Sequence, residues 1–355
     1  MPIPTEPIGS IPRPKSLIDG IGAFAAGRLS QSELDRLYDA ALVDTIKQFE
    51  ATGSPVITDG EQTKPSFATY PIHGLKTLAP GGVTIPFADG HTRQLPVITA
   101  GPFRYQIYAD RYLEAAKRHT RLPVKQAVIS ASALSLLYPP AGIPGYSQEA
   151  FLDDLLREHE TDIRRCLQKD AHVVQIDFTE GRLALKLDPS GGLLKQFIDL
   201  NNRVLERFSP EERERIGVHT CPGGDRDSTH SADVDYAGLL RQLFKLNAGN
   251  FYLQLASERD RGRVLRIIKE QSQPHQRIFI GVTDPISSKV ETAEEVKARV
   301  LEAADVLPVE WLGTTDDCGF SPFGDDTSTS RETAFAKVRA RIDGTQLAAK
   351  ALGIA

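Results

Sequence analysis

The chain has 355 residues, of which 40% are hydrophobic and 25% are charged, with a formal net charge of −5. This balance is ordinary for a globular protein, and it excludes the basic surface of a nucleic-acid-binding protein. No apolar run approaches the ~18 residues of a membrane span, and the N-terminus lacks a basic region followed by an apolar core, so we expect a cytoplasmic protein without a membrane partner. The three cysteines are too few for a disulfide framework and favour a metal or catalytic role.

The first third of the chain contains two predicted strands, a helix and an insertion. Residues 5–14 predict a short strand that leaves into a loop. Ser30, with Glu33 three positions later, caps a helix that ends near Gly53, and residues 55–61 predict a second strand that ends in acids. Residues 78–106 alternate between apolar and polar around Asp89-Gly90, which predicts an inserted β-hairpin.

The rest of the chain alternates between strands and helices. The predicted strands cover 124–130, 172–177, 216–220, 251–255, 278–282 and 310–314, and the predicted helices cover 105–119, 147–169, 193–208, 232–247, 259–270, 292–306 and 331–352. Eight strands result, beginning at Pro7, Val56, Gln126, Val173, Ile216, Tyr252, Phe279 and Trp311. Eight alternating units without a linker predict α/β architecture, a single (β/α)8 TIM barrel that spans residues 1–355 as one catalytic domain.

Polar residues gather where these strands end, and in a TIM barrel the carboxyl ends of the strands form the active-site mouth. The residues at the predicted strand ends are Ile8-Gly9-Ser10, Asp59-Gly60-Glu61, Ser130, Asp177, His219-Thr220-Cys221, Gln254, Asp284 and Asp317-Cys318. Residues two apart on a strand share a face, so His219 and Cys221 both point into the mouth, where Cys318 completes a His/Cys/Cys set. Such a set leaves one coordination position open, which is typical of a catalytic zinc site.

An open zinc site of this kind suits the activation of a thiol. Bound Zn²⁺ holds a substrate thiol as the thiolate and so provides a nucleophile at neutral pH. Three acids are then available to hold a cationic group, such as the α-amine of an amino-acid thiol: Asp59, Glu61 and Asp177. Alternatively, these acids only cap chain ends and form ion pairs at the barrel mouth. Cys166, within a predicted helix, is expected to be a small buried hydrophobe, and His230, like the remaining histidines, is expected to have no role.

Five motifs, in order along nearly the whole chain, resemble the cobalamin-independent methionine synthase family, specifically its catalytic C-terminal barrel. They are Ile8-Gly9-Ser10-Ile11-Pro12, Asp59-Gly60-Glu61, Gln175-Ile176-Asp177, His219-Thr220-Cys221 and Asp317-Cys318-Gly319. The resemblance implies Zn²⁺ held by His219, Cys221 and Cys318, with Glu61 and Asp177 as catalytic residues. It also implies a thiol substrate, homocysteine, that contacts Ile8, Gly9, Ser10, Asp59, Glu61 and Asp177 and is methylated to methionine.

The chain departs from the family pattern at three points. Gln254 stands where the family has a zinc-binding glutamate, so the fourth ligand is expected to be Gln254, water or Glu258. The resemblance covers the catalytic barrel alone, so we expect no counterpart of the separate N-terminal half of the full-length enzyme, which helps to hold a polyglutamylated folate. Residues 130–134 lack the tryptophan that the family stacks on the pterin, and the only tryptophan is Trp311. We therefore expect a methyl donor other than, or simpler than, polyglutamyl folate.

Three alternative functions fit a barrel with this mouth. An epoxyalkane:coenzyme M transferase would activate a sulfonate-bearing thiol and would need cations such as Arg13, Lys64 and Arg182 beside the site. A uroporphyrinogen-decarboxylase-like barrel would share the fold without a metal and would not need Cys221 or Cys318. A zinc- or thiol-binding protein without turnover is the non-enzymatic alternative.

Overall fold

Six parallel strands form the central sheet in the structure, a computed structural model that describes residues 3–354. The order in the sheet is β12-β11-β10-β7-β6-β5, and all neighbouring pairs are parallel. The bounds are β5 (Gln126–Ile129), β6 (Val174–Asp177), β7 (Ile216–Thr220), β10 (Asn250–Leu253), β11 (Arg277–Thr283) and β12 (Leu312–Asp316). Nearly every residue of these strands is buried, as expected for a parallel sheet covered on both faces. Residues 1, 2 and 355, the ends of the predicted domain, lie outside the described part.

Two extended segments continue the sheet beyond its outer strands. Thr5 forms a parallel bridge with Thr314 of β12, and Ile57 forms one with Val124, just ahead of β5. The segments also meet each other, because the amide of Ile11 donates to the carbonyl oxygen of residue 60 at 3.0 Å. Eight extended segments therefore follow one another around the barrel, as predicted.

The first two predicted strands are present only as isolated bridges, which corrects the expectation for residues 5–14 and 55–61. Pro4, Pro7 and Pro12 cannot donate hydrogen bonds to a ladder. In the second segment Gly60 and Glu61 have φ values of 65° and 55°, which are outside the β region and end the extended backbone.

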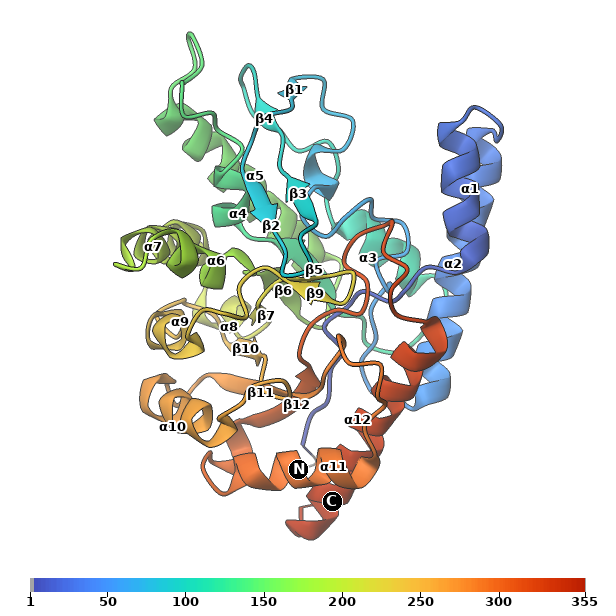
Figure 1. Cartoon of the computed structure of the whole chain (residues 1–355), viewed down its shortest axis with the longest axis vertical. Coiled ribbons are helices and arrows are strands. Elements are labelled where there is room, and N and C mark those ends of the chain that lie inside the picture. Colours follow the sequence, from blue (N-terminus) through green and yellow to red (C-terminus); the bar gives the residue numbers. More distant parts are fainter. Residues whose placement is uncertain (1–2, 355) are drawn as a thin grey trace.

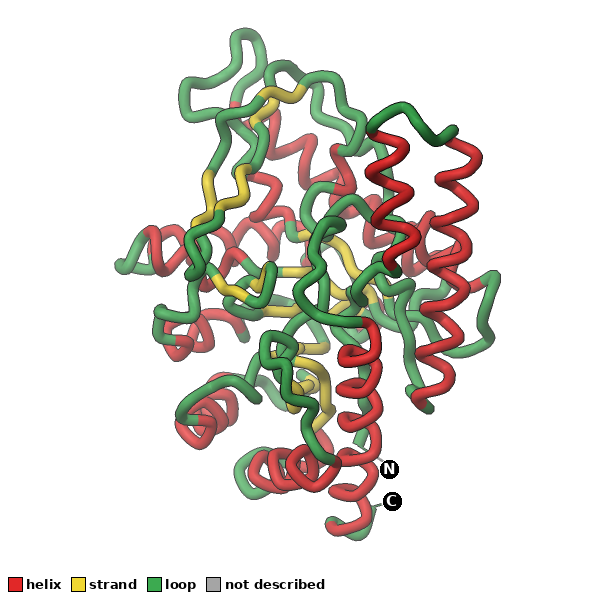
Figure 2. The backbone as a smooth tube through the Cα atoms, turned by 45° about the vertical axis from the view of Figure 1, so that its right-hand side comes forward, coloured by secondary structure: helices red, strands yellow, loops and turns green. Residues whose placement is uncertain are grey.

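Helices surround the sheet (Figures 1 and 2). Eight of them fall on predicted segments: α2 (Gln31–Thr52), α3 (Asp110–Lys117), α5 (Gln148–Gln168), α7 (Gly192–Leu205), α9 (Tyr236–Leu243), α10 (Arg261–Gln271), α11 (Ala293–Ala304) and α12 (Arg331–Ala351). Helix α3 starts later than predicted, and so does α9, whose N-cap is Asp235. Two short strands, β8 (Gly224–Asp225) and β9 (Ser228–Thr229), lie between β7 and α9. The helices α1 (Lys15–Ala25), α4 (Ala131–Ser135), α6 (Glu180–Leu187) and α8 (Pro210–Arg213) were not predicted.

Local sequence sets the ends of the best-predicted helices. Helix α2 begins at the Ser30 capping box with Glu33 and ends at Gly53, whose φ of 78° is left-handed. The final strand starts one residue after Trp311, which lies in the short 3-10 helix η2 (Val309–Trp311).

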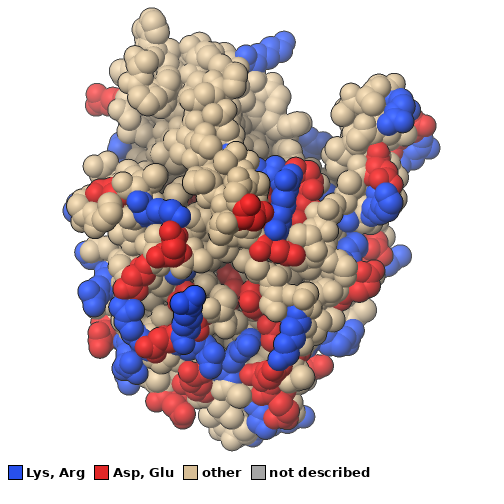
Figure 3. Space-filling view, in the orientation of Figure 1, with Lys and Arg blue, Asp and Glu red and all other residues tan. Residues whose placement is uncertain are grey.

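None of the described helices has the length and apolarity that a membrane span requires. Acidic and basic side chains are interspersed over the lower part of the face in Figure 3.

The predicted inserted hairpin is confirmed. Strands β2 (Thr84–Pro86) and β3 (Thr92–Gln94) pair antiparallel, and β1 (Leu78–Ala79) pairs with β4 (Val97–Ile98). The short helix η1 (Tyr70–Ile72) precedes this insertion. In Figure 1 the insertion lies above the central strands, and the lower end of its β2–β3 hairpin comes close to β9. A backbone hydrogen bond of 2.9 Å from Ala88 to the carbonyl oxygen of Thr229 joins the two.

Candidate active site

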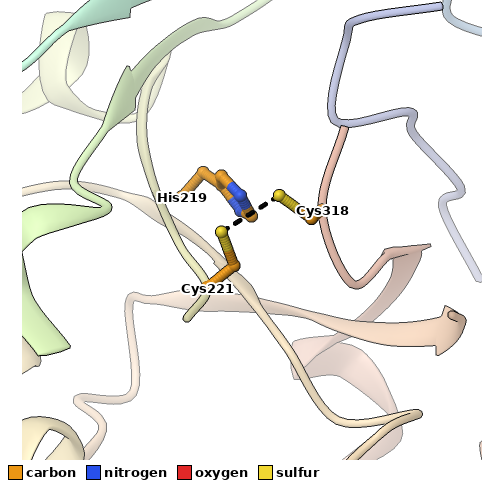
Figure 4. A group of neighbouring side chains, drawn as sticks. All are labelled: His219, Cys221 and Cys318. Atoms are coloured by element: carbon orange, nitrogen blue, oxygen red, sulfur yellow. Dashed lines mark hydrogen bonds between the residues drawn. The ribbon is translucent and has the colours of Figure 1, made fainter. Parts of the chain in front are cut away.

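His219, Cys221 and Cys318 form a cluster at the barrel mouth (Figure 4). His219 lies in β7, Cys221 follows that strand, and Cys318 follows β12. The sulfur atoms of the two cysteines are 3.0 Å apart, and one ligand atom from each of the three residues lies within 4.8 Å of the others. The fold therefore brings together the three residues that strand-end reasoning selected.

The imidazole of His219 is held in a defined orientation. Its Nδ1 lies 3.2 Å from the carbonyl oxygen of Tyr252, which can only accept a hydrogen bond, so Nδ1 carries the proton. The Nε2 atom is buried and has no hydrogen-bond partner among residues 3–354. An oriented imidazole with a free lone pair beside two sulfur atoms fits the ligand set of a soft divalent metal ion.

Asp317 fixes the backbone next to Cys318. Its Oδ1 accepts hydrogen bonds of 2.8 Å from the amides of Leu255 and Ala256, and its Oδ2 accepts two of 2.7 Å from the amide and hydroxyl of Ser257. Burial raises the pKa of Asp317 to about 6, although these hydrogen bonds act in the opposite direction. Asp317 thus ties the turn after β10 to the segment that carries a metal-ligand candidate, a role that the motif alone did not reveal.

Ser10 is tied into the loop that follows Cys318. Its hydroxyl oxygen accepts a hydrogen bond of 3.1 Å from the amide of Ser321, and its carbonyl oxygen accepts one of 3.0 Å from Phe320. A Cβ atom added to Gly319 would lie 2.2 Å from the Ser10 hydroxyl oxygen, so the close approach of these two segments requires glycine there. The first and last of the five motifs are therefore one structural unit.

Glu61 and Asp177 are both buried, and they line the same pocket as Ser10. The carboxylate of Glu61 lies 2.9 Å from Nζ of Lys64, and both side chains are almost fully buried. Burial alone would lower the pKa of Lys64, but Glu61 and Asp59 outweigh it and raise that pKa above its usual value. Burial raises the pKa of Asp177 to about 6, with Glu61 adding to the rise and His219 opposing it.

One pocket joins several of these groups. Of the predicted site residues, its lining includes Ile8, Gly9, Ser10, Glu61, Asp177, His219 and Cys318. The lining also contains residues to which sequence reasoning assigned no role, namely Phe67, Ile85, Phe87, Thr179, His230 and Phe323. Burial, followed by Lys186 and Arg182, lowers the pKa of His230 to about 4, so this imidazole is neutral at pH 7.

Three predicted residues are not in the described lining of the pocket, namely Cys221, Asp59 and Gln254. Asp59 is buried behind Glu61, and its Oδ1 accepts a hydrogen bond of 3.2 Å from the Glu61 amide. Gln254 uses both ends of its amide elsewhere: Oε1 accepts from Arg182 at 3.1 Å, and Nε2 donates to Ser257 at 2.8 Å and to Glu258 at 3.1 Å. Three hydrogen bonds therefore hold the Gln254 amide outside the lining of the pocket.

A further buried acid, Glu180, lies at the start of α6. Its Oε1 accepts hydrogen bonds from the hydroxyls of Ser130, at 2.5 Å, and Ser132. Its Oε2 has no partner among the described residues. Burial raises the pKa of Glu180 to about 7, although both hydroxyls lower it.

This raised pKa makes stability depend on pH. Between the unfolded pKa of 4.5 and the folded pKa of about 7 the native chain binds the extra proton, so the free energy of unfolding falls as pH rises through this window. We expect Glu180→Gln, which keeps the accepting oxygen, to unfold like the parent at pH 4.5 but to be more stable by about 3 kcal/mol at pH 8. Urea unfolding at the two pH values measures this; a variant less stable than the parent at pH 8 would contradict it.

Fold and site together define a class: barrel enzymes that present an open His/Cys/Cys set beside carboxylates and act on a thiol. Residues 3–342 match the sequence profile of the family described as "Cobalamin-independent synthase, Catalytic domain". The chain belongs to this family, and the resemblance seen in its motifs is confirmed.

Relatives and solved structures agree with this assignment. The chain is similar to a methionine synthase from Saccharolobus solfataricus, with 21% identity over 97% of this chain and 94% of the relative. It is also similar, at 24% identity, to a 5-methyltetrahydropteroyltriglutamate–homocysteine methyltransferase from Synechococcus, of which it covers 40%. Its fold is similar to that of a B12-independent methionine synthase from Shewanella solved with selenomethionine, with a TM-score of 0.79, 19% identity and full coverage of both chains. A putative Listeria monocytogenes homologue gives a TM-score of 0.72 at 21% identity, with 97% of each chain covered.

Proposed function

We propose that this protein is a zinc-dependent methyltransferase that converts homocysteine to methionine. The observation that carries the proposal is the pocket lined by His219 and Cys318, two members of the metal cluster, together with Glu61 and Asp177. When bound, Zn²⁺ supplies a Lewis acid that holds the substrate sulfur as its thiolate. The relatives named methionine synthase support the same reaction.

The residues of the chain position the substrate in this proposal. Asp177 and Glu61 bind the α-amine of homocysteine, and Ser10 with the backbone of Ile8 and Gly9 forms the floor under its amino-acid end. The Nδ1 hydrogen bond of His219 to a backbone carbonyl keeps Nε2 directed at the metal position. The methyl carbon then forms a bond to sulfur as its bond to the donor breaks, and the electron pair of that bond leaves with the donor.

The proposal includes a methyl donor simpler than a polyglutamyl folate. No Lys or Arg is among the described residues that line the pocket, so the site offers little to a chain of carboxylates. The stretch after β5 presents serines, and Ser130 and Ser132 are buried in hydrogen bonds with Glu180. An aromatic platform for a pterin is missing from that stretch.

The proposal also covers the domain organisation of the chain and its location in the cell. We propose that it acts as one catalytic domain, because the pocket is built from segments as distant as Ser10 and Phe323. We propose the cytoplasm as its location, because a site made of cysteine thiolates needs reduced thiols. The partners are then a small-molecule thiol and a small-molecule donor.

The sulfonate-thiol alternative is disfavoured by the partners of the three candidate cations. Nη2 of Arg13 donates to the carbonyl oxygens of Glu61, at 2.7 Å, and Lys64, at 2.6 Å. The Lys64 ammonium pairs with Glu61, and Arg182 lies 3.1 Å from the carboxylate of Glu258. Each of the three cations therefore already has a hydrogen-bond acceptor or ion-pair partner within the protein, so none is free to bind a substrate sulfonate.

A metal-free decarboxylase would leave the main features of the mouth unexplained. It has no use for two sulfur atoms 3.0 Å apart or for a buried imidazole Nε2 without a described partner. Family membership disfavours it as well. A thiol-binding protein without turnover would have the same metal site as the proposed enzyme. It would differ from the enzyme only because it forms no product.

The test combines metal analysis with a donor panel. Protein purified without chelator should contain about one zinc per chain. It should form methionine from L-homocysteine with at least one donor among methylcobalamin, S-methylmethionine and the mono- and triglutamates of 5-methyltetrahydrofolate. We expect the triglutamate to give no advantage over the monoglutamate, and removal of zinc to stop the reaction. Protein that lacks zinc yet makes methionine would refute the proposal, and zinc-loaded protein inactive with every donor would favour the binding-protein alternative.

A further inference from the structure

The β2–β3 hairpin supplies one wall of the active-site pocket. Ile85 and Phe87 line the pocket together with His219 and Cys318. The ring of Phe87 is almost buried: it stacks on His91 with the ring centres 4.4 Å apart and meets His230 edge-on at 5.7 Å. The two side chains that the hairpin contributes are apolar, whereas Glu61 and Asp177, which line the same pocket, are carboxylates outside the hairpin.

Arg93 clamps the hairpin to the barrel. It lies directly opposite Ile85 in the β2–β3 ladder. Its guanidinium donates to both carboxylate oxygens of Asp225, at 2.6 and 3.3 Å, and to both of Asp325, at 2.8 and 3.1 Å. The same guanidinium lies 4.4 Å from the ring centre of Phe323, another residue of the pocket wall. One side chain therefore connects three parts of the wall.

The two acids that Arg93 binds belong to the loops that carry the cysteines of the metal cluster. Asp225 follows Cys221 by four residues, and Asp325 follows Cys318 by seven. The side chain of Asp225 is fully buried; its Oδ2 lies 2.6 Å from Nε of Arg93 and 2.9 Å from Nε2 of His91. Charge-assisted, bidentate hydrogen bonds of this kind fix geometry more strongly than neutral ones.

We propose that the β2–β3 hairpin forms the donor side of the active site and that Arg93 is the positioning residue that holds it over the metal cluster. The donor assignment rests on the proposed function. Ile85 and Phe87 line the same pocket as Glu61 and Asp177. Because the two carboxylates are proposed to bind the amino-acid end of the thiol, the apolar wall is left for the group that brings the methyl. An apolar wall there excludes water from the thiolate during transfer.

The first experiment measures the position of the hairpin without metal, substrate or activity. Reduced, metal-free protein is treated with iodoacetamide, and the modification of Cys318 and Cys221 is followed by peptide mass spectrometry. In Arg93→Gln the loss of the clamp opens the hairpin more often, and we expect both cysteines to react roughly tenfold faster than in the parent. Arg93→Lys, which keeps one charged donor, should fall between the two. Cys166, fully buried, is the internal control for global unfolding.

Arg203→Gln is the matched control, because Arg203 forms an ion pair with Asp153 at 3.3 Å in which both side chains are about half exposed. We expect it to react like the parent. Should Arg93→Gln fail to fold, Asp325→Asn removes only the exposed half of the clamp and should still accelerate alkylation roughly threefold. Alkylation in the folded clamp variants within twofold of the parent rate would overturn the proposal.

The second experiment tests which substrate the hairpin faces. In Co²⁺-loaded protein we expect Phe87→Ala to leave the affinity for L-homocysteine within twofold of the parent value, because the thiol amino acid is proposed to bind Glu61 and Asp177 and not the hairpin. A tenfold or larger loss would place the hairpin on the thiol side and overturn the donor assignment. Absence of any response to L-homocysteine in the parent would instead refute the proposed function, and the alkylation result would still stand.

Discussion

Replacing either Cys221 or Cys318 by serine is expected to abolish stoichiometric metal binding and to lower methyl transfer roughly a thousandfold or more. The two sulfur atoms are 3.0 Å apart and provide two of three ligands, so a hydroxyl in place of either leaves too few soft donors to hold Zn²⁺. Zinc content and the initial rate of methionine formation measure the effect.

Cys166→Ser is the control for this pair of variants. Cys166 is fully buried in α5 and packs with the main hydrophobic core, outside the cluster. The control is expected to lose stability but to retain zinc and the parent rate at a temperature where it is folded. A Cys318→Ser protein that keeps a full zinc complement and turns over within tenfold of the parent would remove Cys318 from the proposed ligand set.

Asp177→Asn is expected to raise the KM for L-homocysteine roughly 30- to 100-fold, because the buried carboxylate is proposed to pair with the α-amine of the substrate. The hydrogen bond of 2.8 Å that Gln175 donates to Oδ1 is retained by the amide oxygen of asparagine, so the local structure is kept. The KM for 4-mercaptobutyrate, which lacks the amine, should change less than threefold. Equal increases for both thiols would show that Asp177 does not recognise the amine.

Glu61→Gln tests the same amine-binding subsite, and it is also expected to lower the stability of the protein. Besides weakening amine binding, it leaves the buried ammonium of Lys64 without its carboxylate partner. We therefore expect a lower thermal midpoint in Glu61→Gln but not in Asp177→Asn. A comparison of the two variants separates recognition of the substrate from stability of the barrel mouth.

Much of the fold was predictable from local patterns. The capping box at Ser30 and the left-handed Gly53 define the ends of α2, and apolar runs define the six strands of the sheet. Helix α1 was missed because Gly20 and Gly22 weaken its helical pattern. The structure gives the reason for Gly20: an added Cβ would lie 2.2 Å from Leu37, so glycine allows α1 and α2 to pack closely.

The metal cluster was predictable because strand-end residues of a barrel converge regardless of their separation in sequence. The positions of Asp59 and Gln254 were not. Asp59 accepts a hydrogen bond from the amide of Glu61, whose φ is positive, and the amide of Gln254 is held by Arg182 of helix α6. The contribution of Phe87 was also hidden, since it depends on packing across more than a hundred residues.

The visible spectrum of Co²⁺-substituted protein tests the central claim most directly. Two cysteine sulfurs and one imidazole should give an intense tetrahedral spectrum. We expect L-homocysteine to add a further thiolate-to-cobalt band that saturates at about one equivalent, while 2-mercaptoethanesulfonate at the same concentration leaves the spectrum unchanged. A spectrum that does not respond to saturating L-homocysteine would contradict an open metal position for the substrate sulfur, and with it the proposed mechanism.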